Sequence, residues 1–285
     1  MELHAIGKKD RPPVLVLPGE GRTAEETAAA LKKLKKSYRV LIGDLAGAEE
    51  LPALEEALRQ EGCGALWGAY GLDKGAEELL GLLERDRLDI RTRVVEGRFV
   101  PPEEAPAGDE RIRCWTGKKD KEGKAALEAL RARGWQASAL TLKKLPKGES
   151  TLSYCPGTAA AQLKKAFGEA ECVCRTVVFP FGMEPVWALL EQRPDPREAA
   201  RLDRSEGLRR DEAKRTLLYQ GSGGAMPVWV HRITLEAVDE GHTRVTDRIC
   251  FRAGNKKFKK STVKNYLLRL TLERLLALLK ESHAV

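Results

Sequence analysis

Residues 66–76 read Leu-Trp-Gly-Ala-Tyr-Gly-Leu-Asp-Lys-Gly-Ala. The apolar first half predicts a buried strand, and the residues from Ala76 onward have the composition and spacing of a helix. Between them, Gly71 and Gly75 flank Asp73 in a Gly-x-Asp-x-Gly pattern, which is typical of a sharp strand-to-helix turn. The stretch therefore predicts an α/β unit that presents Asp73 at its turn.

The rest of the first 168 residues repeats this alternation of strand and helix. Apolar runs predict strands at 14–17, 39–42, 64–70, 91–99, 111–115 and 135–142. Helical spacing predicts helices at 23–36, 51–60, 76–85, 121–133 and 158–167. Strands that are separated by helices of this length imply βαβ units and a short, mostly parallel sheet.

The pattern changes after Gly168. Strands are predicted at 172–181, 216–220, 228–238 and 243–252, with a short helix at 183–192 and a long one at 257–281. Consecutive strands without intervening helices indicate an antiparallel sheet. We therefore predict an α/β domain over 1–168 and an α+β domain over 169–285. Leucines at 268, 272, 275 and 279 predict the buried face of the last helix.

The composition and charge of the chain limit which kinds of partner, cofactor and cellular location we expect. The 285 residues carry 50 basic and 42 acidic side chains, a net charge of +8 that is spread along the chain. A diffuse excess does not call for a nucleic-acid partner, and we expect none. The 6 cysteines show no zinc-binding spacing, so we expect buried, reduced thiols, with no metal and no cofactor. No signal pattern opens the chain and no run of about 18 apolar residues occurs, so we expect a cytoplasmic protein without a membrane span.

The first 167 residues resemble the small α/β-hydrolases of anaerobic gut bacteria. The resemblance rests on four motifs in the family's order: an opening strand with its loop at 6–19, the elbow at 71–75, and the loops at 115–121 and 145–149. It implies that Asp73 stands at the nucleophile position, with Lys74 next to it. It places Asp120 where the acid would be, Lys147 where the catalytic His would be, and Pro18 where the oxyanion-loop His would be.

The residues at these positions do not form an intact catalytic triad. A triad needs a nucleophile, a base that moves a proton, and an acid that orients the base. A carboxylate can attack carbon, as in the dehalogenases and epoxide hydrolases of this fold, but a His must then activate water. Lys147 serves as a base at neutral pH only if its pKa is strongly lowered. We therefore expect a non-catalytic scaffold, and an altered activity of Asp73, Lys74 and Lys147 stays an alternative.

Residues 171–281 resemble the SRPBCC (START-like) superfamily. Residues 179–190 read Phe-Pro-Phe-Gly-Met-Glu-Pro-Val-Trp-Ala-Leu-Leu, like the first strand end and short helix of that family. Residues 229–233, Trp-Val-His-Arg-Ile, and 241–248, Gly-His-Thr-Arg-Val-Thr-Asp-Arg, are similar to its ligand-binding hairpin. The resemblance implies a helix-grip fold, in which a curved antiparallel sheet and a long C-terminal helix enclose a ligand cavity.

Strand alternation assigns faces to this hairpin. With a three-residue turn at 239–241 and Gly241 left-handed, His231 lies opposite Ile249 and diagonal to Asp247, on the inner face. The residues that then point outward, to solvent, are Arg232, Arg244, Arg248 and Arg252. The predicted cavity lining is Trp187, Trp229, His231, Ile233, Val245, Asp247 and Phe251. The buried His231/Asp247 pair has two interpretations. Either the two residues only satisfy each other's hydrogen bonds, or they form an anchor for a ligand.

The sequence thus predicts a two-domain protein that binds a small apolar or amphipathic molecule in its C-terminal domain. One alternative is a hydrolase or cyclase-like enzyme that uses Asp73 or the His231/Asp247 pair. Another alternative is a protein-interaction module. The sequence makes no prediction of the oligomeric state.

Overall fold

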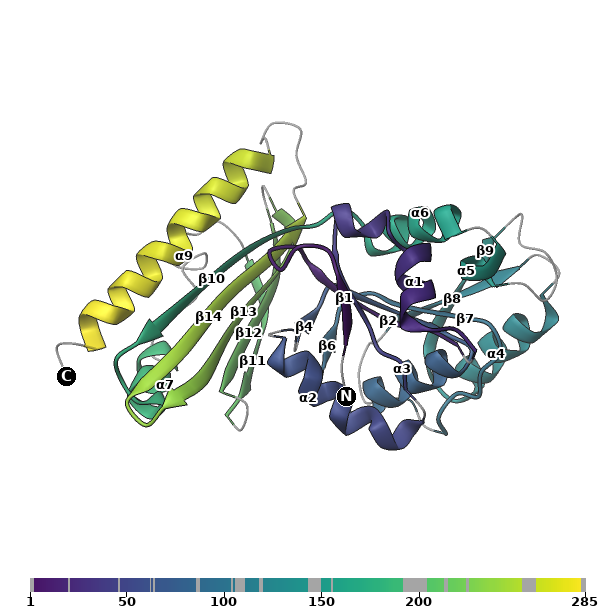
Figure 1. Ribbon diagram of the computed structural model, residues 1–285, viewed down its shortest axis with the longest axis horizontal. Coiled ribbons are helices and arrows are strands. Elements are labelled where there is room, and N and C mark those ends of the chain that lie inside the picture. The colour runs from purple at the N-terminus through teal and green to yellow at the C-terminus, as the bar shows by residue number, and fades with distance from the viewer. Residues whose placement is uncertain are drawn as a thin grey trace. The chain divides into compact units, whose positions relative to one another are not determined.

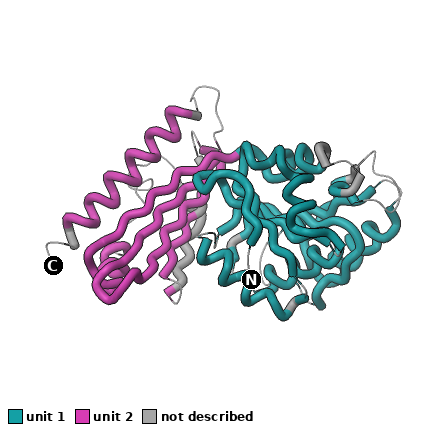
Figure 2. Tube along the Cα trace, in the orientation of Figure 1, with its two compact units in different colours: residues 1–169 teal, residues 170–285 magenta. Residues whose placement is uncertain are grey.

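The computed structural model describes residues 3–19, 21–45, 47–61, 63, 65–85, 88–103, 105, 111–117, 120–142, 150–154, 156–191, 204–212, 215–223, 226–252 and 260–282. The chain forms two compact units, residues 1–169 and residues 170–285 (Figure 2). Each unit has its own sheet and its own apolar core. Among the described residues, no helix combines the length and the apolar character that a bilayer crossing requires.

The first unit is built on a mostly parallel sheet. Its strands are β1 (His4–Ile6), β2 (Pro13–Leu17), β3 (Arg39–Ile42), β5 (Gly68–Leu72), β7 (Arg93–Glu96), β8 (Arg111–Gly117) and β9 (Gln136–Leu142). They lie in the order β1-β3-β2-β5-β7-β8-β9, with only β1 antiparallel to its neighbour. A small parallel pair, β4 (Ala65–Leu66) and β6 (Asp89–Ile90), stands apart from this sheet. The α/β-hydrolase-like arrangement predicted from the sequence is confirmed.

Helices cover both faces of this sheet. They are α1 (Ala24–Ala30), α2 (Leu51–Gln60), α3 (Lys74–Glu84), α4 (Lys121–Ala132), α5 (Thr151–Tyr154) and α6 (Pro156–Phe167), with short 3-10 turns at Leu34–Lys36 and Ala48–Glu50. Figure 1 shows α1 and α6 on one side of the sheet and α2, α3 and α4 on the other. Every residue of β2, β3 and β5 is buried, which explains why these strands read as continuous apolar runs rather than as alternating ones.

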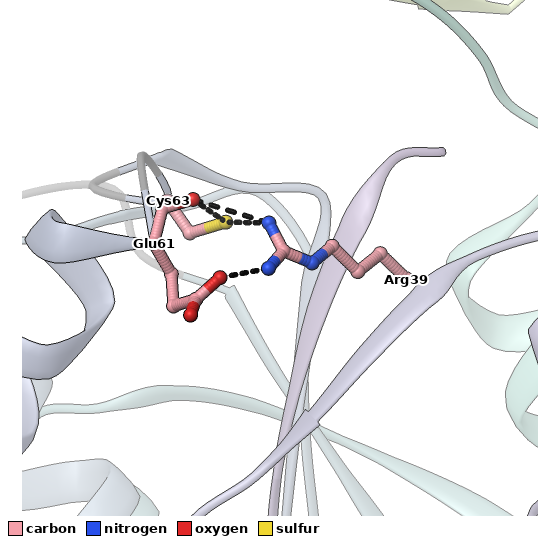
Figure 3. Close-up of polar contacts among 3 residues, drawn as sticks. All are labelled: Arg39, Glu61 and Cys63. Atoms are coloured by element: carbon pink, nitrogen blue, oxygen red, sulfur yellow. Dashed lines mark hydrogen bonds and ion pairs between the residues drawn. The ribbon is translucent and has the colours of Figure 1, made fainter. Parts of the chain in front are cut away.

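A buried arginine fastens the end of α2 to this sheet. Arg39, the first residue of β3, forms an ion pair with Glu61 just after α2. Its Nη1 also donates to the Glu61 carbonyl oxygen at 3.1 Å and lies 3.7 Å from the Cys63 Sγ (Figure 3). A buried charge is tolerated when it is paired and hydrogen-bonded in this way. Four buried cysteines form no disulfide, namely Cys63, Cys114, Cys172 and Cys250.

The second unit is a helix-grip fold. Its elements are β10 (Glu171–Phe179), α7 (Met183–Glu191), β11 (Arg204–Asp211), β12 (Thr216–Gly223), β13 (Met226–Asp239), β14 (His242–Arg252) and α9 (Lys260–Ser282). The strands form an antiparallel sheet in the order β10-β14-β13-β12-β11, and α9 runs along it (Figure 1). The predicted combination of a parallel α/β sheet and a helix-grip sheet is therefore confirmed.

The buried face of α9 matches the predicted one in part: Leu275 is buried and Leu268 and Leu279 pack against the core. Leu272, expected inside, is 41% exposed, whereas Leu267 and Thr271 are buried. Leucines occur on several sides of this helix, so their spacing alone did not identify the side that faces the sheet. The inward face also carries a charged residue, Arg274, which is only 6% exposed.

Candidate functional site

Asp73 occupies the sharp turn between β5 and α3. Its backbone angles are φ 50° and ψ −118°, a combination that costs a non-glycine residue about 1–3 kcal/mol. A Cβ at Gly71 would lie 2.4 Å from the Gly75 carbonyl oxygen, and a Cβ at Gly75 would lie 2.3 Å from that of Leu17. Only glycine fits at these two positions, so the strand and the helix approach closely and the turn between them is forced.

The side chain of Asp73 is held by the backbone that follows β7. Its Oδ1 accepts a hydrogen bond of 2.7 Å from the Arg98 backbone N–H. Gly97, which has φ +92°, makes room for this contact, because a Cβ there would lie 2.0 Å from the same oxygen. Burial raises the pKa of Asp73, although the hydrogen bond from Arg98 lowers it. The carboxylate is thus fixed in place rather than free to rotate.

Asp73 opens onto a cleft of about 1010 Å³ within the first unit. The lining includes Lys74 and Glu77 of α3, the segment 98–101, Glu122 of α4, and Arg133 directly after α4. The cleft is open to solvent, and charged residues of both signs line it. Such a surface leaves Asp73 in contact with water rather than in the closed, dry environment that strengthens catalytic electrostatics.

Asp120, which was predicted at the position of the catalytic acid, forms hydrogen bonds with nearby backbone groups. Asp120 is the N-cap of α4: its Oδ1 accepts from the Gly123 backbone N–H at 2.9 Å. Its Oδ2 accepts from the Gly117 N–H at 3.4 Å. These bonds satisfy backbone donors at the start of the helix. Lys147, predicted at the place of the catalytic His, lies outside the described residues.

Sequence reasoning missed a buried carboxyl group near the elbow. Glu96, at the end of β7, accepts from the Tyr70 hydroxyl at 2.6 Å. It also accepts from the Thr151 N–H at 2.6 Å and from the Thr151 hydroxyl at 2.7 Å. Burial raises the pKa of Glu96, and these three hydrogen bonds oppose that rise. An acid that directly follows the apolar pair in Arg-Val-Val-Glu at 93–96 was the available signal.

The second unit holds a buried polar pair between neighbouring strands. His231 lies opposite Ile249, and Ile233 lies opposite Asp247, as the predicted register requires. The His231 Nε2 and the Asp247 Oδ1 are 2.7 Å apart, and each residue is 1% exposed. The Tyr219 ring stacks on the imidazole with centroids 5.5 Å apart. The pair is therefore short, almost completely desolvated and fixed in orientation.

Apolar side chains surround this pair. The apolar residues of the predicted lining belong to one buried cluster between the sheet, α7 and α9, namely Trp187, Trp229, Ile233, Val245 and Phe251. The structure therefore brings these five residues together on the side of the sheet that faces α9. That they line a ligand cavity stays a prediction.

Two details of the predicted hairpin were wrong. The connection between β13 and β14 consists of Glu240 and Gly241, with a register shift between Ala237 and Asp239, and Gly241 does not adopt a positive φ. The Gly241 N–H instead donates to the Asp239 Oδ1 at 2.9 Å, which stabilises the turn without a left-handed residue. Arg232 and Arg248, predicted to face solvent, are each only 8% exposed. They lie opposite one another in the ladder.

Within the described ranges, no cluster of three or more His, Cys, Asp or Glu side chains is arranged to hold a metal ion. The side chains named above either form hydrogen bonds or contribute apolar surface. The chemistry that these residues can support is recognition of a small molecule or proton transfer, with Asp73 as the one strained carboxylate.

Comparison with known proteins finds likeness in fold only. The sequence matches no protein-family model and no curated protein. Among solved structures, the chain is similar to a putative α/β hydrolase family protein from Desulfitobacterium hafniense, with 15% identity and a TM-score of 0.47 over 59% of this chain and 100% of that one. It is similar to the Zhui aromatase/cyclase from a Streptomyces species, with 14% identity and a TM-score of 0.32 over 40% of this chain and 94% of that one. A START superfamily protein from Mycobacterium smegmatis matches at 12% identity and a TM-score of 0.29, over 39% and 94% of the two chains.

Proposed function

We propose that the second unit binds a small apolar or amphipathic molecule between its sheet and α9. The observation that carries this proposal is the His231/Asp247 pair, buried within a cluster of large apolar side chains. Ligand sites in proteins are commonly apolar and contain a few fixed polar groups. A polar pair in a purely structural core is costly, and apolar residues of similar volume would often serve stability as well. The pair is therefore an anchor for the polar end of a ligand.

The first unit then serves as a scaffold that has the hydrolase outline without the hydrolase chemistry. Three observations support this part of the proposal. Pro18 stands at the oxyanion-loop position, Asp120 caps a helix, and the carboxylate of Asp73 is tied to the Arg98 N–H. None of these groups is placed to pass a proton along a triad.

The binding proposal is tested on the full chain with N-phenyl-1-naphthylamine, a neutral hydrophobic probe. We expect saturable binding, measured by energy transfer from tryptophan, and weaker binding in Phe251→Leu. The matched control is Leu276→Ala, on an exposed position of α9, which should leave affinity unchanged. Hydrogen exchange with and without the probe should show protection in 226–252 and 260–282. Protection confined to α3, α4 and the segment 98–101 would contradict the assignment.

A second candidate function is an altered hydrolase that uses Asp73. The observation that favours it is the strained backbone of Asp73 in an open cleft, because such strain is frequent at functional residues. A carboxylate that attacks carbon forms an ester, which water must then cleave. Turnover of a small epoxide by the full chain, lost in Asp73→Asn but kept in Glu122→Gln, would support this candidate. Equal background rates in all three proteins would exclude it for that substrate class.

A further inference from the structure

Arg274 is a buried cation on the inner face of α9. The other buried positions of this helix are Val263, Leu267, Thr271, Leu275 and Leu278, and Arg274 shares their side. Its side chain is only 4% exposed. A guanidinium stays charged in proteins, so it cannot escape the cost of burial by losing its proton. An apolar residue would suit this position better if packing were the only requirement.

The contacts of Arg274 do not satisfy the hydrogen-bonding capacity of its guanidinium. Its Nη1 lies 3.9 Å from the Asp247 Oδ2, which is an ion pair but is beyond hydrogen-bond distance. Its Nε, Nη1 and Nη2 have no hydrogen-bond partner among the described residues, and the Asp247 Oδ2 has none either. Each buried polar group without a partner costs about 1–3 kcal/mol. The guanidinium is therefore poised to donate to an acceptor that arrives from outside the chain.

The neighbouring groups indicate the charge of that acceptor. The other oxygen of Asp247 is already bound by His231 at 2.7 Å, so the Asp247 carboxylate is only partly available to Arg274. An incoming carboxylate would pair with the guanidinium and accept hydrogen bonds from its N–H groups, which have no partner among the described residues. The planar fork of a guanidinium also matches the two oxygens of a carboxylate.

We propose that Arg274 receives the carboxylate of an amphipathic organic acid, with the apolar body of that acid among the side chains of the buried cluster. This inference rests on the proposed function and narrows it from any amphipathic molecule to an acid. It assigns Arg274 as the residue that distinguishes an acid from its neutral ester. The His231/Asp247 pair positions the guanidinium and completes the polar end of the site.

The test compares two probes, 11-(dansylamino)undecanoic acid and its methyl ester, on the full chain; the ester lacks the negative charge and carries one additional methyl group. We expect the wild-type protein to bind the acid about 10-fold more tightly than the ester, since a charged hydrogen bond contributes about 1.5–3 kcal/mol. Arg274→Met should weaken acid binding by about 10-fold or more and change ester binding by less than about 3-fold. Arg274→Lys, which keeps the charge, should retain part of the preference.

The matched control is Arg269→Met, because Arg269 lies on the exposed side of the same helix and pairs with Glu273 at 2.7 Å. It should leave both affinities unchanged. Equal wild-type affinity for acid and ester, or an equal loss of both in Arg274→Met, would overturn the inference while leaving the binding function intact. Failure of both probes to bind the wild-type protein would refute the binding function itself and this inference with it. Should Arg274→Met unfold at the assay temperature, Arg274→Gln gives the same comparison.

Discussion

Replacing Asp247 by Asn isolates the charge of the buried polar centre. Asn has nearly the same shape and keeps an oxygen that can accept from His231, so the change mainly removes the negative charge opposite Arg274. At the observed 3.9 Å, two unit charges attract by about 4 kcal/mol at an effective dielectric constant near 20. Breaking a buried ion pair commonly costs about 3–5 kcal/mol, because the remaining charge is left without compensation. We expect Asp247→Asn to destabilise the second unit by about 3 kcal/mol.

The assay is native-state hydrogen exchange of β13 and β14 amides in the full chain, which reports the opening free energy of this sheet separately from the first unit. In an Arg274→Met background, the cost of Asp247→Asn should fall to about 1 kcal/mol, since no unpaired cation remains. The matched control is Glu236→Gln on the neighbouring strand β13, whose exposed partner Arg244 lies 3.2 Å away. A surface pair of this kind contributes at most about 1 kcal/mol. A cost below about 1 kcal/mol for Asp247→Asn, or the same cost in both backgrounds, would refute the coupling described here.

Three further predictions concern the catalytic status, the domains and a pH dependence. The full chain should hydrolyse p-nitrophenyl acetate no faster than Asp73→Ala, and a rate lost in that variant would show a working elbow. Residues 169–285 should fold as an isolated fragment with a cooperative thermal transition, and a fragment without one would count against the predicted boundary. Burial raises the pKa of Glu78 from about 4.5 to about 7. Between these two pH values the folded protein keeps a proton on Glu78 that the unfolded chain releases, so the free energy of unfolding falls as pH rises from 4.5 to 7. Glu78→Gln should therefore gain about 1–3 kcal/mol relative to wild type between pH 4.5 and pH 7, and a difference in urea-unfolding free energy that is independent of pH would contradict this.

Local patterns in the sequence predicted the features that depend on backbone geometry. The two glycines around Asp73 predicted the elbow because no other residue fits the close approach of β5, α3 and β2. Alternation along β13 and β14 predicted that His231 and Asp247 share the inner face, because each residue step reverses the face. The predicted pairing of His231 with Ile249 holds because the register shift between Ala237 and Asp239 offsets the shorter connection. Both predictions needed only nearest neighbours along the chain or across one hairpin.

Features that depend on distant partners were not predictable in this way. Arg274 was overlooked because an arginine among leucines reads as part of a solvated helix face, and only the packing of α9 on the sheet shows that it is buried. Arg232 and Arg248 were assigned to solvent because strand alternation places them on the outer face of the hairpin, and alternation does not tell whether that face is covered. The hydrogen-bond partners of Glu96, which are Tyr70 and Thr151, are identified only once the fold brings these residues together.

The geometry of the elbow does not depend on the chemistry of residue 73. Gly71 and Gly75 fix the backbone through contacts with neighbouring backbone atoms, and Gly97 leaves the space into which the side chain projects. A serine at position 73 would therefore occupy the same exposed turn without any rebuilding of the fold. This makes the first unit a starting scaffold for protein engineering, in which a nucleophile, a base and an oxyanion donor could be introduced one at a time and the contribution of each measured against the unaltered chain.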